Sequence, residues 1–247
     1  MNREFLPIHL LNARLRGLYV ITDERMGGGH LAIARAALAG GARIIQLRDK
    51  TTPLARLLPT GRDLRRLTRE AGALLIVNDR IDLALAIEAD GAHVGPDDLA
   101  PHDARRLLGH HRLLGVSCGS PAEARRAEQC GASYIGAGAV FSTATKADAG
   151  DAIGLAGLRS IVAAVVLPVA AIGGLDAENI GGSIQCGAAM ACVVSAIAKT
   201  GDEAAMIAAT RHLVRAVEAK ENARSIANAR RPGESAKLRR RQIYEPS

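Results

Sequence analysis

A short apolar run near residue 46 ends in polar and charged residues whose spacing suits anion binding. Gln46, Arg48 and Lys50 place an amide, a guanidinium and an ammonium within five residues. Alternate side chains of a strand point to the same face, so Gln46 and Arg48 share a face and Lys50 follows at the rim. A guanidinium fork with an ammonium point charge suits a phosphate or diphosphate. The alternative is an ordinary charged surface cluster.

The next two apolar runs end in carboxylates. Asn78 and Asp79 close one run, and Asp97 and Asp98 follow the other. Two carboxylates at neighbouring strand ends, completed by water and phosphate oxygens, form a common Mg²⁺ site. Asp97 is also placed to cap the helix expected just after it. His93, inside the second run, is interpreted either as a packed or orienting side chain or as a base.

Hydroxyl and glycine residues mark a second candidate anion site later in the chain. A glycine-rich stretch leads to Thr143, Thr145 and Lys146, whose two hydroxyls and ammonium fit an anionic group, although this pattern has low specificity. Gly174 and Ser195 follow two further apolar runs. In barrels of alternating strands and helices, backbone N–H groups at these places commonly bind phosphate. A simpler interpretation is that the glycines only permit a tight turn.

The elements that must position these residues form one repeating pattern from residue 17 to residue 217. Short apolar runs alternate with Ala/Leu/Arg segments of helical spacing. The apolar runs show no polar alternation, which is typical of strands buried on both faces of a parallel sheet. We predict strands at 18–22, 43–48, 73–78, 91–94, 113–117, 133–136, 168–172 and 190–195.

Eight strands alternating with helices in about 200 residues indicate an α/β fold, a single (β/α)8 barrel of the TIM type. An open doubly wound sheet is the alternative, but its usual G-x-G-x-x-G turn is absent after 18–22. We therefore expect an N-terminal extension at 1–16, a catalytic barrel at 17–217 and a mobile basic tail at 218–247.

The distribution of charge along the chain favours small anionic substrates over nucleic acid. The chain of 247 residues carries a net charge of +7, and residues 218–247 contain eight Lys or Arg and four Glu, a net +4. We favour a solvated tail over a nucleic-acid arm, and the mildly basic body suits small anionic substrates. Aromatic residues make up only 2%, which argues against stacking platforms for single-stranded nucleic acid.

Hydropathy favours a cytoplasmic protein that does not contact a membrane. No apolar run reaches the ~18–20 residues of a membrane span. The first residues contain Arg14 and Arg16 and no small-residue cleavage site, so they make a poor signal peptide. We expect small phosphorylated molecules as partners and leave the oligomeric state open.

The four cysteines form no C-x-x-C pair and no disulfide framework, which argues against zinc and redox sites. Cys130, Cys186 and Cys192 are interpreted as buried small apolar residues. Cys118 follows Ser117 in a candidate site, but a nucleophilic role is disfavoured because no base is adjacent in sequence.

An ordered set of segments between residues 18 and 197 resembles the thiamine-phosphate synthase family. The segments are, in order, LYVITDE, IIQLRDK, LLIVNDRIDLALAIEADGAHVG, DDL, LLGVS, YIGAGAVFSTATK, VAAIGG and VVSAI. The resemblance implies a barrel that joins 4-amino-5-hydroxymethyl-2-methylpyrimidine diphosphate to a thiazole phosphate and releases diphosphate. It does not distinguish a carboxylated thiazole from the simpler hydroxyethyl form.

The resemblance also implies residue roles. The residues that would hold the pyrimidine diphosphate are Gln46, Arg48, Lys50, Asn78, Ser117 and Lys146. The residues that would hold the thiazole phosphate are Thr143, Thr145, Gly174, Val194 and Ser195. Asp79 and Asp98 would ligate Mg²⁺. The catalytic residues, which would neutralise the departing diphosphate, are Arg48, Lys50, Ser117 and Lys146.

The chain departs from the family pattern beside these positions. Pro96 stands where Gln is usual, Cys118 and Gly119 replace Thr-His, and Ser142 and Ala144 replace prolines. These changes affect neighbours of the matched polar groups and can loosen the thiazole site. Two rival interpretations are a thiazole tautomerase with the same barrel and a non-catalytic thiazole-phosphate sensor. The predicted diphosphate-binding set argues against the tautomerase, which has no diphosphate to bind.

Overall fold

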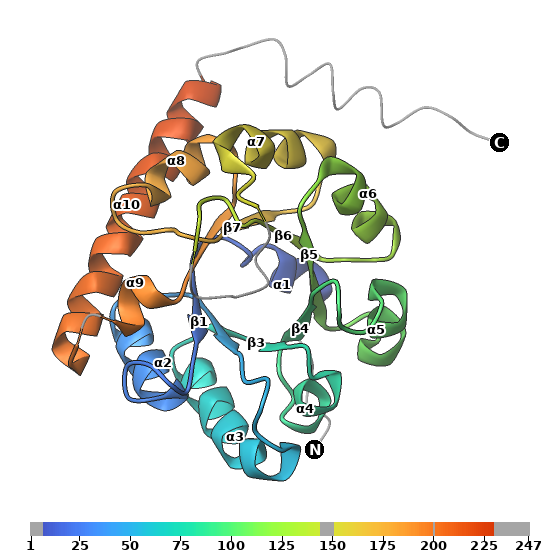
Figure 1. The fold of residues 1–247 in the computed structure, drawn as a ribbon, viewed down its shortest axis with the longest axis vertical. Coiled ribbons are helices and arrows are strands. Elements are labelled where there is room, and N and C mark those ends of the chain that lie inside the picture. The colour runs from blue at the N-terminus through green and yellow to red at the C-terminus, as the bar shows by residue number, and fades with distance from the viewer. Residues whose placement is uncertain (1–6, 144–150, 200, 230–247) are drawn as a thin grey trace.

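The structure is a computed structural model that describes residues 7–143, 151–199 and 201–229. Within these residues, eight parallel strands close into a barrel in which each strand pairs with the next and the last pairs with the first (Figure 1). The strands are β1 (Gly17–Thr22), β2 (Ile44–Leu47), β3 (Leu74–Asn78), β4 (Gly91–Val94), β5 (Leu113–Cys118), β6 (Tyr134–Ala137), β7 (Val169–Ile172) and β8 (Met190–Val193). The predicted single (β/α)8 barrel is confirmed.

Helices follow the strands and surround the barrel (Figure 1). The helices after the strands are α2 (His30–Ala39), α3 (Leu54–Glu70), α4 (Ile81–Ala86), α5 (Pro101–Leu108), α6 (Pro121–Gln129), α7 (Gly154–Ala164), α8 (Ile180–Gln185), α9 (Ser195–Ala198) and α10 (Glu203–Ala229). A first short helix, α1 (Ile8–Asn12), precedes β1. Among the helices described, none is long and apolar enough to span a membrane.

The core has two layers because alternate strand residues face opposite sides of the sheet. Leu18 and Val20 of β1 belong to the layer between strands and helices, whereas Tyr19 and Ile21 belong to the layer inside the barrel. Both faces of each strand are therefore covered. This double burial explains why the strands read as continuous apolar runs in the sequence.

The N-terminal extension closes the end of the barrel where the strands begin. Leu11 and Leu15 are buried in the inner layer together with Leu74 and Leu113, which are the first residues of β3 and β5. Figure 1 shows α1 across the centre of the barrel. Leu11 in α1 and Leu15 just after it both reach this inner layer, so residues 8–15 act as a plug.

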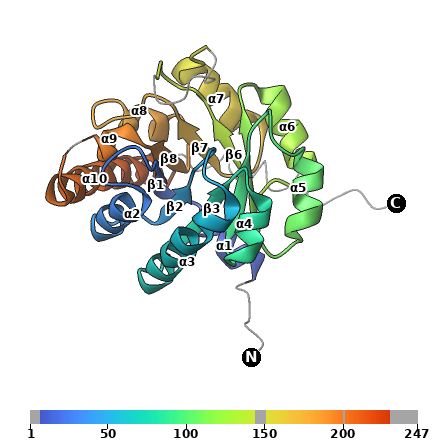
Figure 2. The same ribbon diagram turned by 60° about the horizontal axis from the view of Figure 1, so that its bottom comes forward.

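Helix α10 extends past the boundary expected at residue 217. It packs along α2 and α8 and continues to Ala229 (Figure 2). Arg224 donates hydrogen bonds to the carbonyls of Ile184 (3.1 Å) and Ala188 (3.0 Å), at the C-terminal end of α8. The Ile184 carbonyl also accepts a hydrogen bond from the Gly187 amide, so Arg224 adds to the backbone contacts between α8 and β8. Of the tail expected at 218–247, residues 218–229 continue α10, and residues 230–247 lie outside the described residues.

Candidate active site

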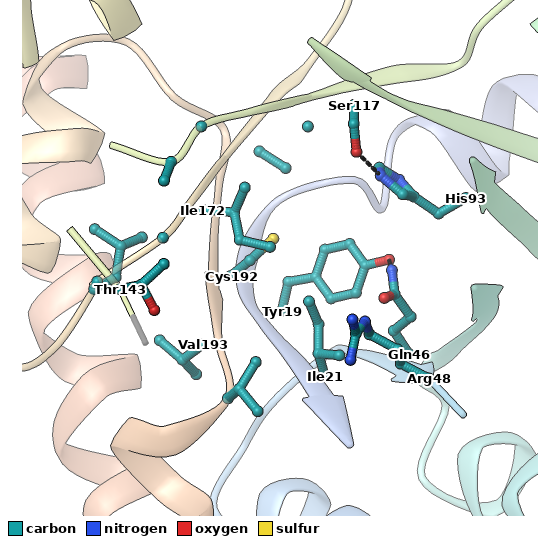
Figure 3. A pocket seen from close by; sticks show the side chains of 18 of the residues that line it. Tyr19, Ile21, Gln46, Arg48, His93, Ser117, Thr143, Ile172, Cys192 and Val193 are labelled. Atoms are coloured by element: carbon teal, nitrogen blue, oxygen red, sulfur yellow. Dashed lines mark hydrogen bonds between the residues drawn. The ribbon is translucent and has the colours of Figure 1, made fainter. Parts of the chain in front are cut away.

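A pocket of about 600 Å³ lies at the carboxyl ends of the strands. Its lining includes residues from all eight strands, and Figure 3 shows side chains that reach into it from both sides. Pockets of roughly 300–1,000 Å³ are typical of small-molecule sites. In (β/α)8 barrels this end carries the active site, because the strand-to-helix loops converge there.

The first predicted anion-binding group lies on one side of this pocket. Gln46, near the end of β2, and Arg48, just after it, line the same cavity, as strand alternation predicted (Figure 3). Lys50 lies in an adjoining smaller hollow that also includes Arg48, Asn78 and Ser117. The structure therefore brings together polar residues from β2, β3 and β5 that are widely separated in the sequence.

The two predicted metal-binding carboxylates lie in this smaller hollow. Asp79 follows β3 and Asp98 lies in the loop after β4, where its carboxylate accepts a hydrogen bond from the Gly95 amide at 2.7 Å. Burial, together with the neighbouring Asp98 carboxylate, raises the pKa of Asp79 to about 6. Lys50 lies 3.5 Å from Asp79 and opposes this rise. The hollow is lined by three carboxylates, Asp79, Asp97 and Asp98, and by two cationic side chains, Arg48 and Lys50, and this excess of carboxylates favours a bound cation.

The donor set suits Mg²⁺. In the described parts of the chain, no group of three or more His, Cys, Asp or Glu side chains could hold a metal ion. Mg²⁺ is commonly bound by only one or two carboxylates, with water and substrate phosphate oxygens completing the shell. Asp79 and Asp98 match that requirement. The expectation that Asp97 caps a helix is wrong, because Ala100 is the N-cap of α5 and no side chain caps that helix.

Glycines form the opposite side of the pocket. Gly173 and Gly174 follow β7 with φ values of 101° and 63°, which favour glycine. A Cβ on Gly173 would lie 2.6 Å from the Ala139 Cα, and one on Gly174 would lie 2.7 Å from the Ser142 carbonyl oxygen. The glycines are therefore required by the turn itself, as the simpler interpretation held, and they also line the pocket.

The other predicted thiazole-side residues are divided between described and undescribed parts of the chain. Thr143, Val194 and Ser195 line the pocket beside the glycines. Thr145 and Lys146 lie outside the described residues, as does Ala144, one of the departures from the family pattern. The remaining departures line the pocket: Pro96, Cys118, Gly119 and Ser142.

Cys118, the cysteine beside Ser117, is a poor candidate for a nucleophile. Cys118 is buried, and burial raises the pKa of its thiol to about 12, so it stays protonated at neutral pH. Cys186 and Cys192 are buried as expected, whereas Cys130 is only half-buried.

Sequence reasoning missed two tyrosines at the floor of the pocket. Tyr19 and Tyr134 are fully buried, and their hydroxyls lie 2.9 Å apart. Tyr19 accepts a hydrogen bond from Gln46, and Tyr134 contacts His93, which in turn contacts Ser117. The available signal was that both tyrosines interrupt apolar runs with a hydroxyl that burial forces to find a partner. These contacts are compatible with the interpretation of His93 as an orienting side chain.

Sequence reasoning also missed charged residues at the rim. Asp23, just after β1, is buried in the pocket wall and accepts hydrogen bonds from Arg25 at 2.9 and 3.1 Å. These bonds hold the pKa of Asp23 below its usual value. Lys199, which follows α9, lines the pocket on its glycine side.

Comparisons with known proteins agree with this geometry. Residues 18–197 match the family model described as "Thiamine monophosphate synthase". The thiamine-phosphate synthase of Moorella thermoacetica is 50% identical over 199 residues, which cover 80% of this chain and 95% of the relative. That of Methanoculleus marisnigri is 47% identical over 204 residues, with 82% and 97% coverage. The solved structure of thiamine phosphate pyrophosphorylase from Pyrococcus furiosus has a TM-score of 0.78 and 41% identity, covering 85% of this chain and 98% of that one.

Proposed function

The chain belongs to the thiamine monophosphate synthase family, and from this premise we propose the following reaction and residue roles. As a family member it is a transferase that joins a pyrimidine to a thiazole. Its substrates are 4-amino-5-hydroxymethyl-2-methylpyrimidine diphosphate and a thiazole phosphate, and its products are thiamine phosphate and diphosphate. The observation that supports this most is the grouping of Arg48, Lys50, Ser117 and two carboxylates opposite a glycine-lined wall.

The charged side of the pocket binds the pyrimidine diphosphate. Arg48 and Lys50 bind its phosphate oxygens, and the Ser117 hydroxyl and the Asn78 amide add hydrogen bonds at the junction of the pocket and the hollow. Gln46, farther into the pocket, contacts the ring. Lys146 is assigned to the same diphosphate by family resemblance alone.

Asp79 and Asp98 hold Mg²⁺ beside the diphosphate. Their closeness and the raised pKa of Asp79 support this assignment, because a bound cation would relieve the repulsion between them. When bound, Mg²⁺ would neutralise charge on the leaving diphosphate.

The residues of the chain act mainly by positioning and electrostatics. The bond between the pyrimidine methylene carbon and the diphosphate oxygen breaks, and its electron pair leaves with the diphosphate. Arg48, Lys50 and Ser117 stabilise the charge that grows on this leaving group. The aminopyrimidine ring delocalises the resulting cation until the lone pair of the thiazole nitrogen forms the new carbon–nitrogen bond. No proton is moved in these steps, so the mechanism requires no general base.

The glycine side of the pocket holds the thiazole phosphate against the methylene carbon. Gly174, Val194 and Ser195 bind its phosphate, and Thr143 and Thr145 contact the thiazole. Four of these five residues line the described pocket, which supports the assignment. Orientation of the nitrogen toward the cation makes the second step effectively unimolecular.

A direct assay tests the reaction. Purified protein is mixed with both substrates in the presence of Mg²⁺ or EDTA, and thiamine phosphate and diphosphate are measured. We expect both products only with Mg²⁺. Binding of thiazole phosphate without product would overturn the synthase and favour a tautomerase or a sensor.

Substitution of the carboxylates tests the metal assignment. Asp79→Ala and Asp98→Ala should each raise the Mg²⁺ concentration needed for half-maximal turnover by at least about tenfold. The exposed Asp63 of α3 offers a matched control, Asp63→Ala, which should not change this concentration. Equal rates in all three variants at limiting Mg²⁺ would show that Asp79 and Asp98 are not metal ligands.

A further inference from the structure

Five side chains form a hydrogen-bonded row across the floor of the pocket, hereafter the polar row. The contacts run in order from Gln46 to Tyr19 (2.7 Å), Tyr134 (2.9 Å), His93 (3.1 Å) and Ser117 (2.9 Å). The residues come from β2, β1, β6, β4 and β5, so the row crosses the barrel rather than following one strand. Figure 3 shows Gln46 beside the Tyr19 hydroxyl and Ser117 above His93.

Neighbouring glycines make room for the row. A Cβ on Gly115 would lie 2.2 Å from the Tyr134 ring and 2.3 Å from His93 Nδ1. A Cβ on Gly136 would lie 2.9 Å from the His93 ring. Neither glycine has a positive φ, so backbone conformation does not call for them. Two strands thus lack side chains where the tyrosine and the histidine are seated.

The number of protons that each group carries decides which group donates and which accepts at every hydrogen bond of the row. The Gln46 Nε2 group can only donate, so the Tyr19 hydroxyl accepts and passes its single proton toward Tyr134. The Tyr134 hydroxyl then donates to His93 Nδ1. A neutral imidazole that accepts at Nδ1 carries its proton on Nε2 and donates it to Ser117 Oγ. The proton of Ser117 is left for a ligand.

Burial keeps the row in this state. Burial raises the pKa of the Tyr19 hydroxyl well above its usual value and also raises the pKa of Tyr134. Both phenols therefore stay protonated and can donate the hydrogen bonds described above. In a buried chain, each hydrogen bond polarises the next. A ligand that donates a hydrogen bond to the side-chain oxygen of Gln46 therefore strengthens the hydrogen bond that the Ser117 hydroxyl donates at the other end of the row.

We propose that the polar row couples the two ends of the pyrimidine diphosphate, with Tyr19, Tyr134 and His93 as positioning residues. This inference rests on the proposed function, which places the ring at Gln46 and the diphosphate at Ser117. The ring amino group donates to the Gln46 carbonyl, and the row transmits that polarisation to the hydroxyl facing the leaving group. Recognition of the correct ring thus strengthens the stabilisation of the diphosphate.

A coupling experiment tests the link. Gln46→Ala and Ser117→Ala are made singly and together, and kcat/KM for the pyrimidine diphosphate is measured in each. We expect the double variant to lose at least about threefold less than the product of the single losses. In a Tyr134→Phe background, which keeps the ring but removes the central hydroxyl, the losses should multiply. Multiplicative losses in both backgrounds would overturn the proposal.

Substitution of His93 separates positioning from packing. A glutamine can accept from Tyr134 with its oxygen and donate to Ser117 with its nitrogen, whereas leucine can do neither. We expect His93→Gln to retain at least about tenfold more kcat than His93→Leu at similar thermal stability. Thr68→Val, which removes a buried hydroxyl in α3 far from the pocket, is the control and should leave kcat unchanged. Equal kcat values for the two His93 variants would contradict a positioning role.

A spectroscopic test is independent of turnover. The ¹⁵N shifts of the His93 ring, assigned by comparison with His93→Gln, report which nitrogen carries the proton. We expect the Nε2–H form in the ligand-free protein at neutral pH, and a changed tautomer ratio in Tyr134→Phe. An Nδ1–H form would reverse the row and overturn the proposal. Because no substrate is needed, this result is distinguishable from a failure of the proposed reaction.

Discussion

The two sides of the pocket are built for anions in different ways. The side at the ends of β2–β5 presents charged side chains, including Arg48, Lys50 and the Asp79–Asp98 pair. The side at the ends of β7 and β8 presents mainly backbone, in the turn at Gly173 and Gly174. A leaving diphosphate gains charge during the proposed reaction, whereas the thiazole phosphate keeps its charge and only has to be held. Most of the charged side chains therefore lie on the first side, whereas Lys199 supplies an ammonium on the second.

The largest expected effect is the loss of a charge from the first side. Arg48→Met should lower kcat/KM by about 10²–10³-fold, because it removes a donor aimed at the developing charge. Steady-state kinetics with both substrates measures the effect, and thermal unfolding should show little change. Arg66→Met on the outer face of α3 is the matched control, since Arg66 is exposed and pairs with its helix neighbours Asp63 and Glu70. A loss of less than threefold for Arg48→Met would contradict the charged-side model.

The second prediction adds a methyl group to the backbone side. Gly174→Ala should raise the KM for thiazole phosphate by about tenfold and lower the free energy of unfolding by about 1–3 kcal/mol, because its Cβ meets the Ser142 carbonyl at a strained φ. Gly72→Ala separates the two causes. Gly72 has nearly the same φ of 62° but nothing within 4 Å of its Cβ, so only the conformational strain of about 1 kcal/mol should remain. An unchanged KM in Gly174→Ala would show that the turn does not hold this substrate.

The third prediction concerns the pH dependence of the metal-free protein. The folded-state pKa of Asp79, about 6, lies above its usual value, so between about pH 4 and pH 6 the folded state binds more protons than the unfolded state. The contribution of Asp79 to stability is present below pH 4 and is lost as the pH rises through 6. Asp79→Asn should therefore increase stability at pH 7 by about 1 kcal/mol. Urea unfolding in EDTA at pH 5 and pH 8 measures this difference.

Mg²⁺ and a neighbouring carboxylate provide the controls for that experiment. Mg²⁺ should stabilise the unsubstituted protein more than Asp79→Asn at pH 8. The exposed Asp63→Asn should behave like the unsubstituted protein. Lower stability of Asp79→Asn than of the unsubstituted protein at pH 8 without Mg²⁺ would contradict the repulsion between Asp79 and Asp98.

The smallest effect on activity is expected outside both sides of the pocket. Deletion of residues 230–247 should leave kcat/KM within about twofold, because every described pocket residue precedes them. Arg224→Ala should also leave kcat/KM unchanged, but it should lower the free energy of unfolding by about 1–2 kcal/mol, since the Ile184 and Ala188 carbonyls each lose a hydrogen bond. A large loss of activity on deletion would show that the tail acts at the pocket.

The strands were predictable from the sequence to within about two residues at each end. Residues 44–47 and 74–78 are apolar except for Gln46 and Asn78 near their ends, and such runs are typical of strands that are buried on both faces. The N-terminal plug was not predictable in the same way. Leu11 and Leu15 lie in a short segment that mixes apolar and polar residues, and only the open end of a closed barrel makes them core residues. The length of α10 was missed because its last turns are rich in polar residues and because Arg224 contacts residues far from it in sequence.

The candidate site also contains residues that the sequence predicts and residues that it does not. Arg48, Asp79 and Asp98 could be found because they follow apolar runs directly, and parallel strands bring their carboxyl ends to one side. The polar row could not be found, since the hydroxyls of Tyr19 and Tyr134 meet across 115 residues of chain. Local sequence thus determined the strands, their order and the charges at their ends. Barrel closure alone decided which inward-facing side chains meet, because contacts between strands that are not adjacent depend on the register and curvature of the whole sheet.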